Sequence, residues 1–490
     1  MFLKNNSIWI EGIPNNKYPR LNKNIDVDVL IIGGGITGVS TAYHLINSKQ
    51  KVCLVERNKI GLGISSKTTG KLTYLQDLMY SKITKKHSIE VAKEYLNAQK
   101  DAIKLVSKIV KNRNIDCNLT KQKSFLFASN EEEVSKVKHE QELLTYMKEN
   151  VNVEKLPINL KSNYAISVSN TYYFHPVKYV KTLAKICSEN NIEIYEESNV
   201  KNLVKDGNSY KCYINDNLVK AKKVILACHY PFFVFPFLFP IKGHLERSYI
   251  GAANVANNND ISGINTSKNS KSFRYHTDGK NNYFIYLTGS HNLAFKFNLK
   301  NNFNNLLKEM NLLKIMPKYI WSNIDIITND YLPYIGYIDE NLLIGTGYNT
   351  WGMTNGSIAG KILSDIVMKK NNKYIKLFNP LRDSSSICSV SEDIFSSAKP
   401  FIENKIIKNK PFYSNRVLFT KKDGKNIAIY IDDENKRHIV YNRCPHLKCS
   451  LIFNEVEKTW DCPCHASRFD IDGNVIEGPS TYNISYKKDN

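Results

Sequence analysis

The glycine-rich stretch near the beginning of the chain constrains the fold more strongly than any other feature of the sequence. Residues 27–57 read VDVLIIGGGITGVSTAYHLINSKQKVCLVER: an apolar run, three spaced glycines, a segment with apolar residues at helical spacing, and a second apolar run. A continuous apolar run of this length is typical of a strand that is buried on both faces. The order therefore predicts a strand–helix–strand unit in a parallel sheet of an α/β domain.

The glycine spacing and one acidic residue predict that this unit binds a dinucleotide. Gly33, Gly35 and Gly38 have G-x-G-x-x-G spacing, and Glu56 ends the second apolar run. In such a unit the first glycine permits a tight turn, the second lets the backbone approach a pyrophosphate, and the third lets helix and strand pack closely. The helix N-terminus favours the phosphates, and Glu56 is expected to accept hydrogen bonds from ribose hydroxyls. The motif alone does not distinguish FAD from NAD.

A second glycine-rich segment lies far along the chain, and it favours FAD. Residues 331–360 read YLPYIGYIDENLLIGTGYNTWGMTNGSIAG, in which an apolar strand again leads through glycines to a helix. Together with DVLIIGGGITG, SSKTTGKLT, FHPVKYVKTLAK and VILACHYPF, this segment resembles the D-amino-acid oxidase/glycine oxidase-like superfamily of FAD-dependent amine oxidoreductases. The likeness covers roughly residues 25–370. It implies a split Rossmann-like α/β domain for FAD and an α+β substrate domain inserted between its pieces.

The resemblance also implies which residues hold FAD and which face the substrate. Val200 is expected to border the adenine through its backbone. The other expected FAD-binding residues are Gly33, Gly35, Ile36, Thr37, Gly38, Glu56, Arg57, Ser65, Ser66, Thr69, Gly347, Gly352, Met353 and Thr354. The substrate site is less well marked, and its candidates are Tyr348, His291 and Tyr230, together with Arg247 and Arg274, which could hold a carboxylate in a bidentate manner. No residue stands out as an acid or base.

Cysteine and histidine residues gather near the end of the chain in two short boxes. CPHLKC spans residues 444–449 and CPCHAS spans residues 462–467. Zinc sites favour C-x2-C pairs, which these boxes lack, and a framework of disulfides alone would leave both histidines unexplained. One cysteine and one histidine from each box give the ligand set of a Rieske [2Fe-2S] centre: Cys444 and Cys462 on one iron, His446 and His465 on the other.

Residues from about 400 to 490 therefore resemble a Rieske domain, which implies a small all-β fold. In respiratory-type Rieske proteins a disulfide clamps the two cluster loops, and the resemblance assigns Cys449 and Cys464 to that bond. The family usually has glycine where Lys448 and Ala466 stand, and such glycines often have positive φ. High-potential members also use a serine and a tyrosine after the second box. This chain keeps Ser467 but has phenylalanine in place of the tyrosine, at position 469.

The expected domain order follows from these two resemblances. An N-terminal extension, residues 1–24, precedes the oxidoreductase unit at 25–370, and a linker at 371–399 leads to the Rieske domain at 400–490. Within the oxidoreductase, the FAD parts are expected at about 25–75, 160–235 and 325–370, and the substrate parts at about 76–160 and 236–325. Residues 76–112 are expected to be strongly helical.

A flavin joined to a one-electron centre predicts a dehydrogenase that oxidises an amine or amino acid and passes electrons to an unidentified one-electron acceptor. Two other classes stay open: a tRNA-modifying flavoprotein, and a redox sensor or electron-transfer module with no small amine substrate. The formal net charge of +22 comes from lysines spread along the chain, so a nucleic-acid partner is not expected. Neither an apolar run long enough to span a membrane nor a signal peptide is evident, and a cytoplasmic location is expected.

Overall fold

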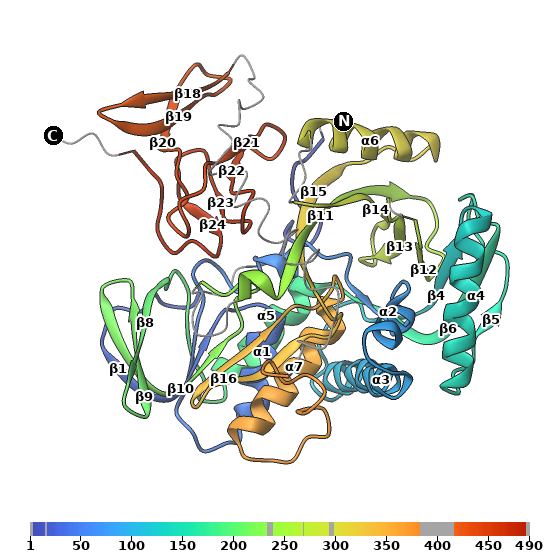
Figure 1. Ribbon diagram of the computed structural model, residues 1–490, viewed down its shortest axis with the longest axis horizontal. Coiled ribbons are helices and arrows are strands. Elements are labelled where there is room, and N and C mark those ends of the chain that lie inside the picture. Colours follow the sequence, from blue (N-terminus) through green and yellow to red (C-terminus); the bar gives the residue numbers. More distant parts are fainter. Residues whose placement is uncertain are drawn as a thin grey trace.

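Two large β-sheets and two small ones organise the part of the chain that the structure describes. The structure is a computed structural model in which residues 3–14, 17–232, 239–267, 269–293, 298–382 and 416–486 are described. The two large sheets belong to the N-terminal four-fifths of the chain, and the small sheets form a separate unit at the upper left of Figure 1, above the first large sheet. Most of the expected linker, and the first part of the expected Rieske domain, fall outside the described residues.

The first large sheet contains the predicted strand–helix–strand unit. Its strands β17, β10, β1, β2 and β7 are parallel neighbours in that order, β16 pairs antiparallel with β17, and a hairpin of β8 and β9 pairs with β10. The bounds are β1 Ile25–Ile32, β2 Val52–Val55, β7 Glu193–Tyr195, β8 Val200–Asp206, β9 Ser209–Ile214, β10 Asn217–Leu226, β16 Tyr334–Asp339 and β17 Leu342–Thr346. The α/β fold that the sequence predicts is therefore present.

The second large sheet is mostly antiparallel and carries the substrate half of the molecule. Its order is β15-β11-β14-β13-β12-β4-β6-β3, and β5 pairs with β6. The bounds are β3 Lys71–Leu72, β4 Thr120–Ala128, β5 Asn152–Val153, β6 Tyr164–Tyr173, β11 Gly243–Val255, β12 Ile261–Asn265, β13 Ser272–Thr277, β14 Asn282–Asn292 and β15 Tyr319–Thr328. Strands β3 and β6 belong to this sheet, although the expected boundaries assigned their residues to the FAD domain. Their partners are distant in sequence, so local pattern could not place them.

Helices cover both sheets and pack against each other between them. They are α1 Ile36–Leu45, α2 Met79–Lys86, α3 Ile89–Asn112, α4 Glu131–Tyr146, α5 Pro176–Ser188, α6 Leu299–Leu312 and α7 Gly352–Val367. Helix α1, which follows the glycine turn, packs against α5 and α7 (Figure 1). The helical stretch expected at 76–112 is two helices, because the chain is extended at Ser88, whose side chain caps the start of α3.

The C-terminal unit is all-β, as expected. One small antiparallel sheet contains β18 Val417–Lys422, β19 Lys425–Ile431 and β20 Arg437–Tyr441. The other contains β21 Ile452–Asn454, β22 Thr459–Asp461, β23 Arg468–Phe469 and β24 Val475–Glu477. The first Cys/His box follows β20, and the second lies between β22 and β23. Both boxes are therefore loops held between short strands.

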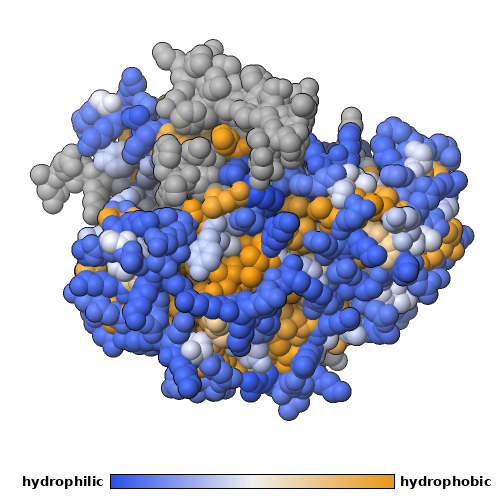
Figure 2. All heavy atoms as spheres, turned by 60° about the horizontal axis from the view of Figure 1, so that its bottom comes forward, coloured by the Kyte–Doolittle hydropathy of each residue, from blue (hydrophilic) through white to orange (hydrophobic). Residues whose placement is uncertain are grey.

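One face of the molecule is mostly hydrophilic. Figure 2 shows hydrophilic residues over most of one face, with a band of hydrophobic ones near its centre. Among the described residues, none of the helices combines the length and apolar character that crossing a membrane requires.

Candidate flavin and iron–sulfur sites

The glycine turn after β1 leaves no room for side chains. Gly33 has a φ of +113°, and a Cβ atom on it would lie 2.5 Å from the backbone oxygen of Ala227. A Cβ atom on Gly38 would lie 1.9 Å from the backbone oxygen of Gly33. Both glycines are thus required by close backbone packing, and they leave the start of α1 open toward a cavity.

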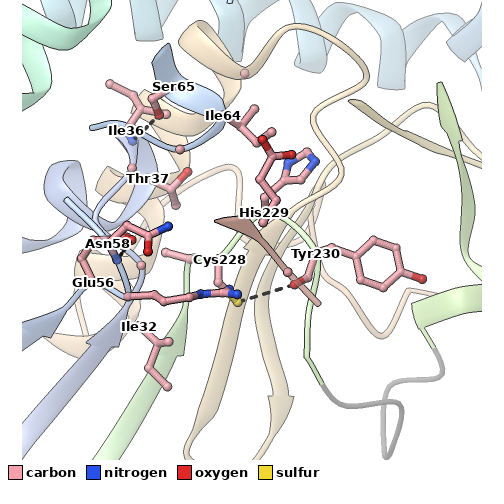
Figure 3. A pocket seen from close by; sticks show the side chains of 18 of the residues that line it. Ile32, Ile36, Thr37, Glu56, Asn58, Ile64, Ser65, Cys228, His229 and Tyr230 are labelled. Atoms are coloured by element: carbon pink, nitrogen blue, oxygen red, sulfur yellow. Dashed lines mark hydrogen bonds between the residues drawn. The ribbon is translucent and has the colours of Figure 1, made fainter. Parts of the chain in front are cut away.

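This cavity extends from the glycine turn to the cluster-bearing unit. Of the expected FAD-binding residues, those that line it are Gly33, Gly35, Ile36, Thr37, Glu56, Arg57, Ser65, Val200, Gly352 and Met353. Figure 3 shows Ile36, Thr37, Glu56 and Ser65 arranged around it, with Cys228, His229 and Tyr230 on the opposite side. Segments far apart in the sequence thus converge on one elongated space at the carboxyl ends of the parallel strands, where α/β folds bind ligands.

The remaining expected FAD-binding residues lie away from the cavity wall. Thr354 sits inside the fold, where its hydroxyl accepts a hydrogen bond from Gln76 at 3.1 Å. Gly38 lies in α1 where the backbone packs closely, Gly347 has a left-handed backbone, Ser66 donates back to its own turn, and Thr69 lines a neighbouring pocket. Their placement reflects packing of the surrounding backbone.

Hydrogen bonds order the polar rim of the cavity. The carboxylate of Glu56 accepts from the backbone N–H groups of Gly34 and Asn58, each at 2.8 Å. The hydroxyl of Ser65 accepts from the N–H of Ile36 at 3.0 Å, beside the first turn of α1. The hydroxyl of Tyr348, a candidate catalytic residue, is hydrogen-bonded to Thr37 at 2.8 Å, and burial raises its pKa. Tyr348 therefore belongs to the wall of this cavity.

One residue that the sequence reasoning did not select is left with an unsatisfied atom here. His229 lines the cavity, and its Nε2 atom is buried without a hydrogen-bond partner among the described residues. Burial lowers its pKa to about 4, so the ring is neutral. A buried polar atom without a partner is costly, and a polar ligand in the cavity would satisfy it. The open start of α1, the glycine turn and His229 together fit an FAD. Only the tertiary fold brings His229 here.

The two Cys/His boxes have the same backbone conformation. The N–H of Cys444 donates to the oxygen of Cys449 at 2.8 Å, and the N–H of Cys462 donates to the oxygen of Ser467 at 2.8 Å, which is the same spacing. Each loop also closes with a bond back to its first cysteine, from Lys448 in one and Ala466 in the other. These two residues have φ of 66° and 61°. The positions where the family usually has glycine are thus left-handed in this chain as well.

The side chains of the boxes converge as a cluster site requires. The rings of His446 and His465 are 5.1 Å apart, and burial lowers their pKa values to about 4 and about 3. Both imidazoles are therefore neutral and can offer a lone pair to a metal. The two ring nitrogens of His446 are buried without a partner among the described residues. An iron ligated by His446 would satisfy one of them, so the donor set fits a [2Fe-2S] cluster.

The two remaining cysteines of the boxes are joined as the resemblance implied. Cys449 and Cys464 form a disulfide that links the loops. The sulfur atoms of Cys449, Cys462 and Cys464 lie within 4.8 Å of one another, but two of the three are consumed by the disulfide. This leaves Cys444 and Cys462 as the thiols of the boxes that are available to a metal, and their role as cluster ligands stays a prediction.

Arg247 lies at the boundary with the cluster-bearing unit, which corrects its expected place beside the substrate. Its Nη2 atom donates to Asp461 at 2.7 Å, and both side chains are almost fully buried. Burial would raise the pKa of Asp461, but Arg468 and Arg247 outweigh that effect and hold the pKa at about 2. The physical reason is strand alternation: Glu246 lines a pocket beside the flavin cavity, so its neighbour Arg247 points to the other face of β11.

Two other substrate-site candidates also lie elsewhere. His291 lines a separate cavity beside α6, where its Nε2 atom is 3.0 Å from the hydroxyl of Tyr249. Arg274 is fully buried, donates to the backbone oxygen of Gly70 at 2.6 Å, and stacks on Trp9 and Tyr173. Both side chains make their contacts in and around the second large sheet and away from the flavin cavity.

Tyr230 connects the two candidate sites. It lines the flavin cavity, and its ring centroid lies 5.8 Å from that of His465 and 6.5 Å from that of His446. Ala466, next to His465, also lines the flavin cavity. One layer of side chains therefore separates the cavity from the cluster ligands.

Further contacts fix this arrangement around the far end of the cavity. Arg57 donates to the backbone oxygen of Ser480 at 2.9 Å, and Asn199 donates to that of Thr481 at 2.7 Å. Lys67 forms a partly buried ion pair with Glu477, and Ile476, Glu477, Gly478 and Thr481 line the same cavity. The cluster-bearing unit thus forms part of the cavity wall. Sequence reasoning assigned the cavity to residues 25–370 alone, because no local signal marks the residues of the C-terminal unit that line it.

Comparison with known proteins agrees with both sites. Residues 28–366 match the FAD dependent oxidoreductase family, DAO, and residues 404–486 match the Rieske [2Fe-2S] domain. The chain is 31% identical over 489 residues to YhfW of Bacillus subtilis, which bears the name of a Rieske 2Fe-2S iron-sulfur protein. That similarity covers 96% of this chain and 95% of the relative.

Solved structures share the fold of the larger unit. Glycine oxidase from Geobacillus kaustophilus has a TM-score of 0.60 at 16% identity, covering 73% of this chain and 99% of that one. L-proline dehydrogenase from P. horikoshii has a TM-score of 0.58 at 16% identity, covering 74% of this chain and 98% of that one.

Proposed function

Because this chain belongs to the FAD dependent oxidoreductase family and carries a Rieske [2Fe-2S] domain, we propose that it oxidises the C–N bond of an amine or amino acid and passes the electrons to the cluster. Its cofactors are FAD and the [2Fe-2S] cluster. The C–N substrate is supported by the fold shared with proteins named glycine oxidase and L-proline dehydrogenase. FAD supplies the two-electron oxidation, and the protein orients the substrate beside it.

The observation that carries the electron-transfer step is the shared wall between the two sites. Tyr230 touches the rings of both cluster histidines and also lines the flavin cavity, and Ala466 of the second loop lines it too. A cluster that served only as a distant structural element would not need its ligand loop in that wall. This arrangement supports direct transfer from flavin to cluster within one chain.

The exit of electrons is proposed on the opposite side of the cluster. Lys448, in the first loop, is exposed to solvent, whereas Ala466, at the same position of the second loop, packs into the core of the FAD domain. A one-electron acceptor would therefore approach the first loop, near His446. Lys448 offers a positive charge to an acidic partner there.

A cluster-free variant tests the proposal. Cys462→Ser should lose the cluster, because a neutral hydroxyl is a poor substitute for an iron-bound thiolate, while the FAD domain keeps its own core. Mixed anaerobically with a substrate amine, the variant should reduce its flavin at a near-normal rate in stopped-flow measurements. Its steady-state turnover with a one-electron acceptor should collapse.

Cys228→Ser is the matched control, since Cys228 lies in the wall of the flavin cavity outside the cluster boxes. Metal and acid-labile sulfide analysis should find iron in this control and none in Cys462→Ser. Normal turnover of Cys462→Ser with a one-electron acceptor would refute transfer through the cluster. Failure of every amine and amino acid to reduce the flavin of the intact protein would refute C–N oxidation.

A further inference from the structure

A second pocket opens beside the flavin cavity, and its wall has an unusual charge pattern. The two spaces share Thr68, Asn323, Asp325, Thr350 and Met353. The second pocket is further walled by alternate residues of β11, namely Glu246, Ser248 and Ile250, so it lies over one face of the antiparallel sheet. A pocket over this sheet that continues into the flavin cavity is placed to hold the substrate.

Two carboxylates face each other in this wall. Glu246 of β11 is directly opposite Asp325 of β15 in the antiparallel register, and both line the pocket. Like charges at opposed positions of neighbouring strands destabilise a sheet. Burial first, and then the charge of Glu246, raise the pKa of Asp325 to about 7. The sheet therefore holds a strained acidic pair that a cation in the pocket would relieve.

A third group in the same wall lacks a partner. Asn323 is 6% exposed, and its amide nitrogen donates to Asp325 at 2.8 Å. That bond fixes the orientation of the amide, so that the carbonyl oxygen Oδ1 is the free end. Oδ1 is buried without a partner among the described residues. It is an acceptor that needs a donor from within the pocket, and an ammonium group supplies one.

The positive charges near the pocket are already engaged. Lys71 is the one cationic side chain among the described residues that line it, and its Nζ donates to the backbone oxygen of Gly263 at 3.0 Å and to Ser272. His244, two residues before Glu246 on β11, lies 3.2 Å from the carboxylate of Glu246. Lys82, which also faces Glu246, is paired with Asp77 at 2.7 Å. No arginine lines the described part of the pocket, since Arg247 points to the other face.

We propose that this pocket selects a substrate with a second cationic group, such as a diamine, through Glu246, Asp325 and Asn323, and disfavours a substrate with a carboxylate beside its amine. The inference rests on the proposed function, because it takes the pocket beside the flavin cavity as the substrate pocket. Trp351, which also lines the pocket, adds an aromatic surface that suits a cation.

Three four-carbon probes test this selection on the intact holoenzyme. Putrescine has a second amine at its far end, butylamine has none, and α-aminobutyrate has a carboxylate beside its amine. Anaerobic bleaching of the flavin reports their oxidation. Putrescine should reduce the flavin at the lowest concentration. Glu246→Gln should raise the half-saturating concentration of putrescine about tenfold, as expected for loss of a hydrogen bond between charged groups, and leave that of butylamine unchanged. Glu142→Gln, on the exposed surface of α4, is the matched control and should change neither.

A binding measurement separates this inference from the proposed function. Isothermal titration of the oxidised protein with diguanidinobutane, a dication that has no free amine, should show binding that Glu246→Gln weakens about tenfold and Glu142→Gln does not. If no probe bleaches the flavin but this binding pattern is seen, oxidation of these amines is refuted and the cation pocket stands. If α-aminobutyrate is the best reductant, or if Glu246→Gln changes neither putrescine nor the dication, the cation pocket is refuted and C–N oxidation is judged on bleaching alone.

Discussion

The two cluster loops, Cys444–Cys449 and Cys462–Ser467, share one backbone conformation but lie in different surroundings. Both close with the same pair of backbone hydrogen bonds and both turn through a left-handed residue. The second loop is buried against the FAD domain, where Ala466 joins its core. The first loop exposes Lys448. The shared backbone conformation is what two matching ligand loops need. Because the surroundings of the loops differ, one side of the cluster site faces the FAD domain and the other side faces solvent.

The flanks of the two loops differ in the same way. Asp461, immediately before the second loop, is buried between Arg247 of β11 and Arg468 of β23. Arg443, immediately before the first loop, is exposed. The second loop is therefore anchored to the rest of the molecule by buried charges. The following predictions test this asymmetry, from the largest expected effect to the smallest.

Breaking the anchor of the second loop should have the largest effect. Asp461→Ala leaves the buried guanidinium of Arg247 without its partner, and an uncompensated buried charge costs about 3–5 kcal/mol. Denaturant unfolding of the holoprotein should show a loss of that order. Asp433→Ala, which removes an exposed ion pair with Arg416 in the same domain, should cost at most about 1 kcal/mol. Equal losses in the two variants would contradict the anchoring role.

Removing the link between the loops should have the next largest effect. The disulfide between Cys449 and Cys464 closes a short segment of chain, with a sequence separation of 15. For a loop of this size, the constraint on the unfolded chain is worth about 3 kcal/mol. The double variant Cys449→Ala/Cys464→Ala should therefore lose its cluster on heating at a lower temperature than the parent protein. The electron paramagnetic resonance signal that remains after each heating step measures this loss. An unchanged melting of that signal would show that the cluster alone holds the loops together.

Hydrogen bonding between the loops should tune the potential of the cluster. The hydroxyl of Ser467, in the second loop, is one of the groups that lower the pKa of the Cys444 thiol in the first loop, so the two side chains interact. Such a bond stabilises the more negative reduced state, so Ser467→Ala should lower the potential. Phe469→Tyr should raise it, because it restores the hydroxyl used by high-potential Rieske proteins. A redox titration that gives the same midpoint in both variants and the parent would refute this account.

The smallest effect should distinguish the two left-handed residues. Lys448→Gly should stabilise the C-terminal domain by about 1 kcal/mol, because glycine adopts a positive φ without steric cost. Ala466→Gly gains the same relief but loses a buried methyl group, worth roughly 0.8 kcal/mol, so its net effect should be close to zero. Thermal unfolding monitored by cluster absorbance measures both. A larger gain from Ala466→Gly would mean that the second loop is not packed as described.

The sequence by itself determined the features whose chemistry depends on short spacing. Gly33 and Gly38 are close in sequence, and a side chain on Gly38 would meet the backbone oxygen of Gly33. The Cys/His boxes are likewise short loops, so the two cysteines and two histidines of the ligand set, and the left-handed positions at Lys448 and Ala466, could be expected from spacing and family likeness. The α/β fold and the all-β C-terminal domain follow from the same local signals.

Only the tertiary structure decided which distant residues meet. Arg247 was a reasonable substrate ligand by its residue type, because a guanidinium can hold a carboxylate. Strand alternation and the docked C-terminal domain instead direct it to Asp461, and its neighbour Glu246 faces the pocket. Strands β3 and β6 join the second sheet through partners that local pattern does not encode. His229, Tyr230 and Ala466 reach the flavin cavity because two segments that are far apart in the chain pack against the glycine turn. These outcomes depend on contacts between residues far apart in the chain, whose energies no short stretch of sequence contains.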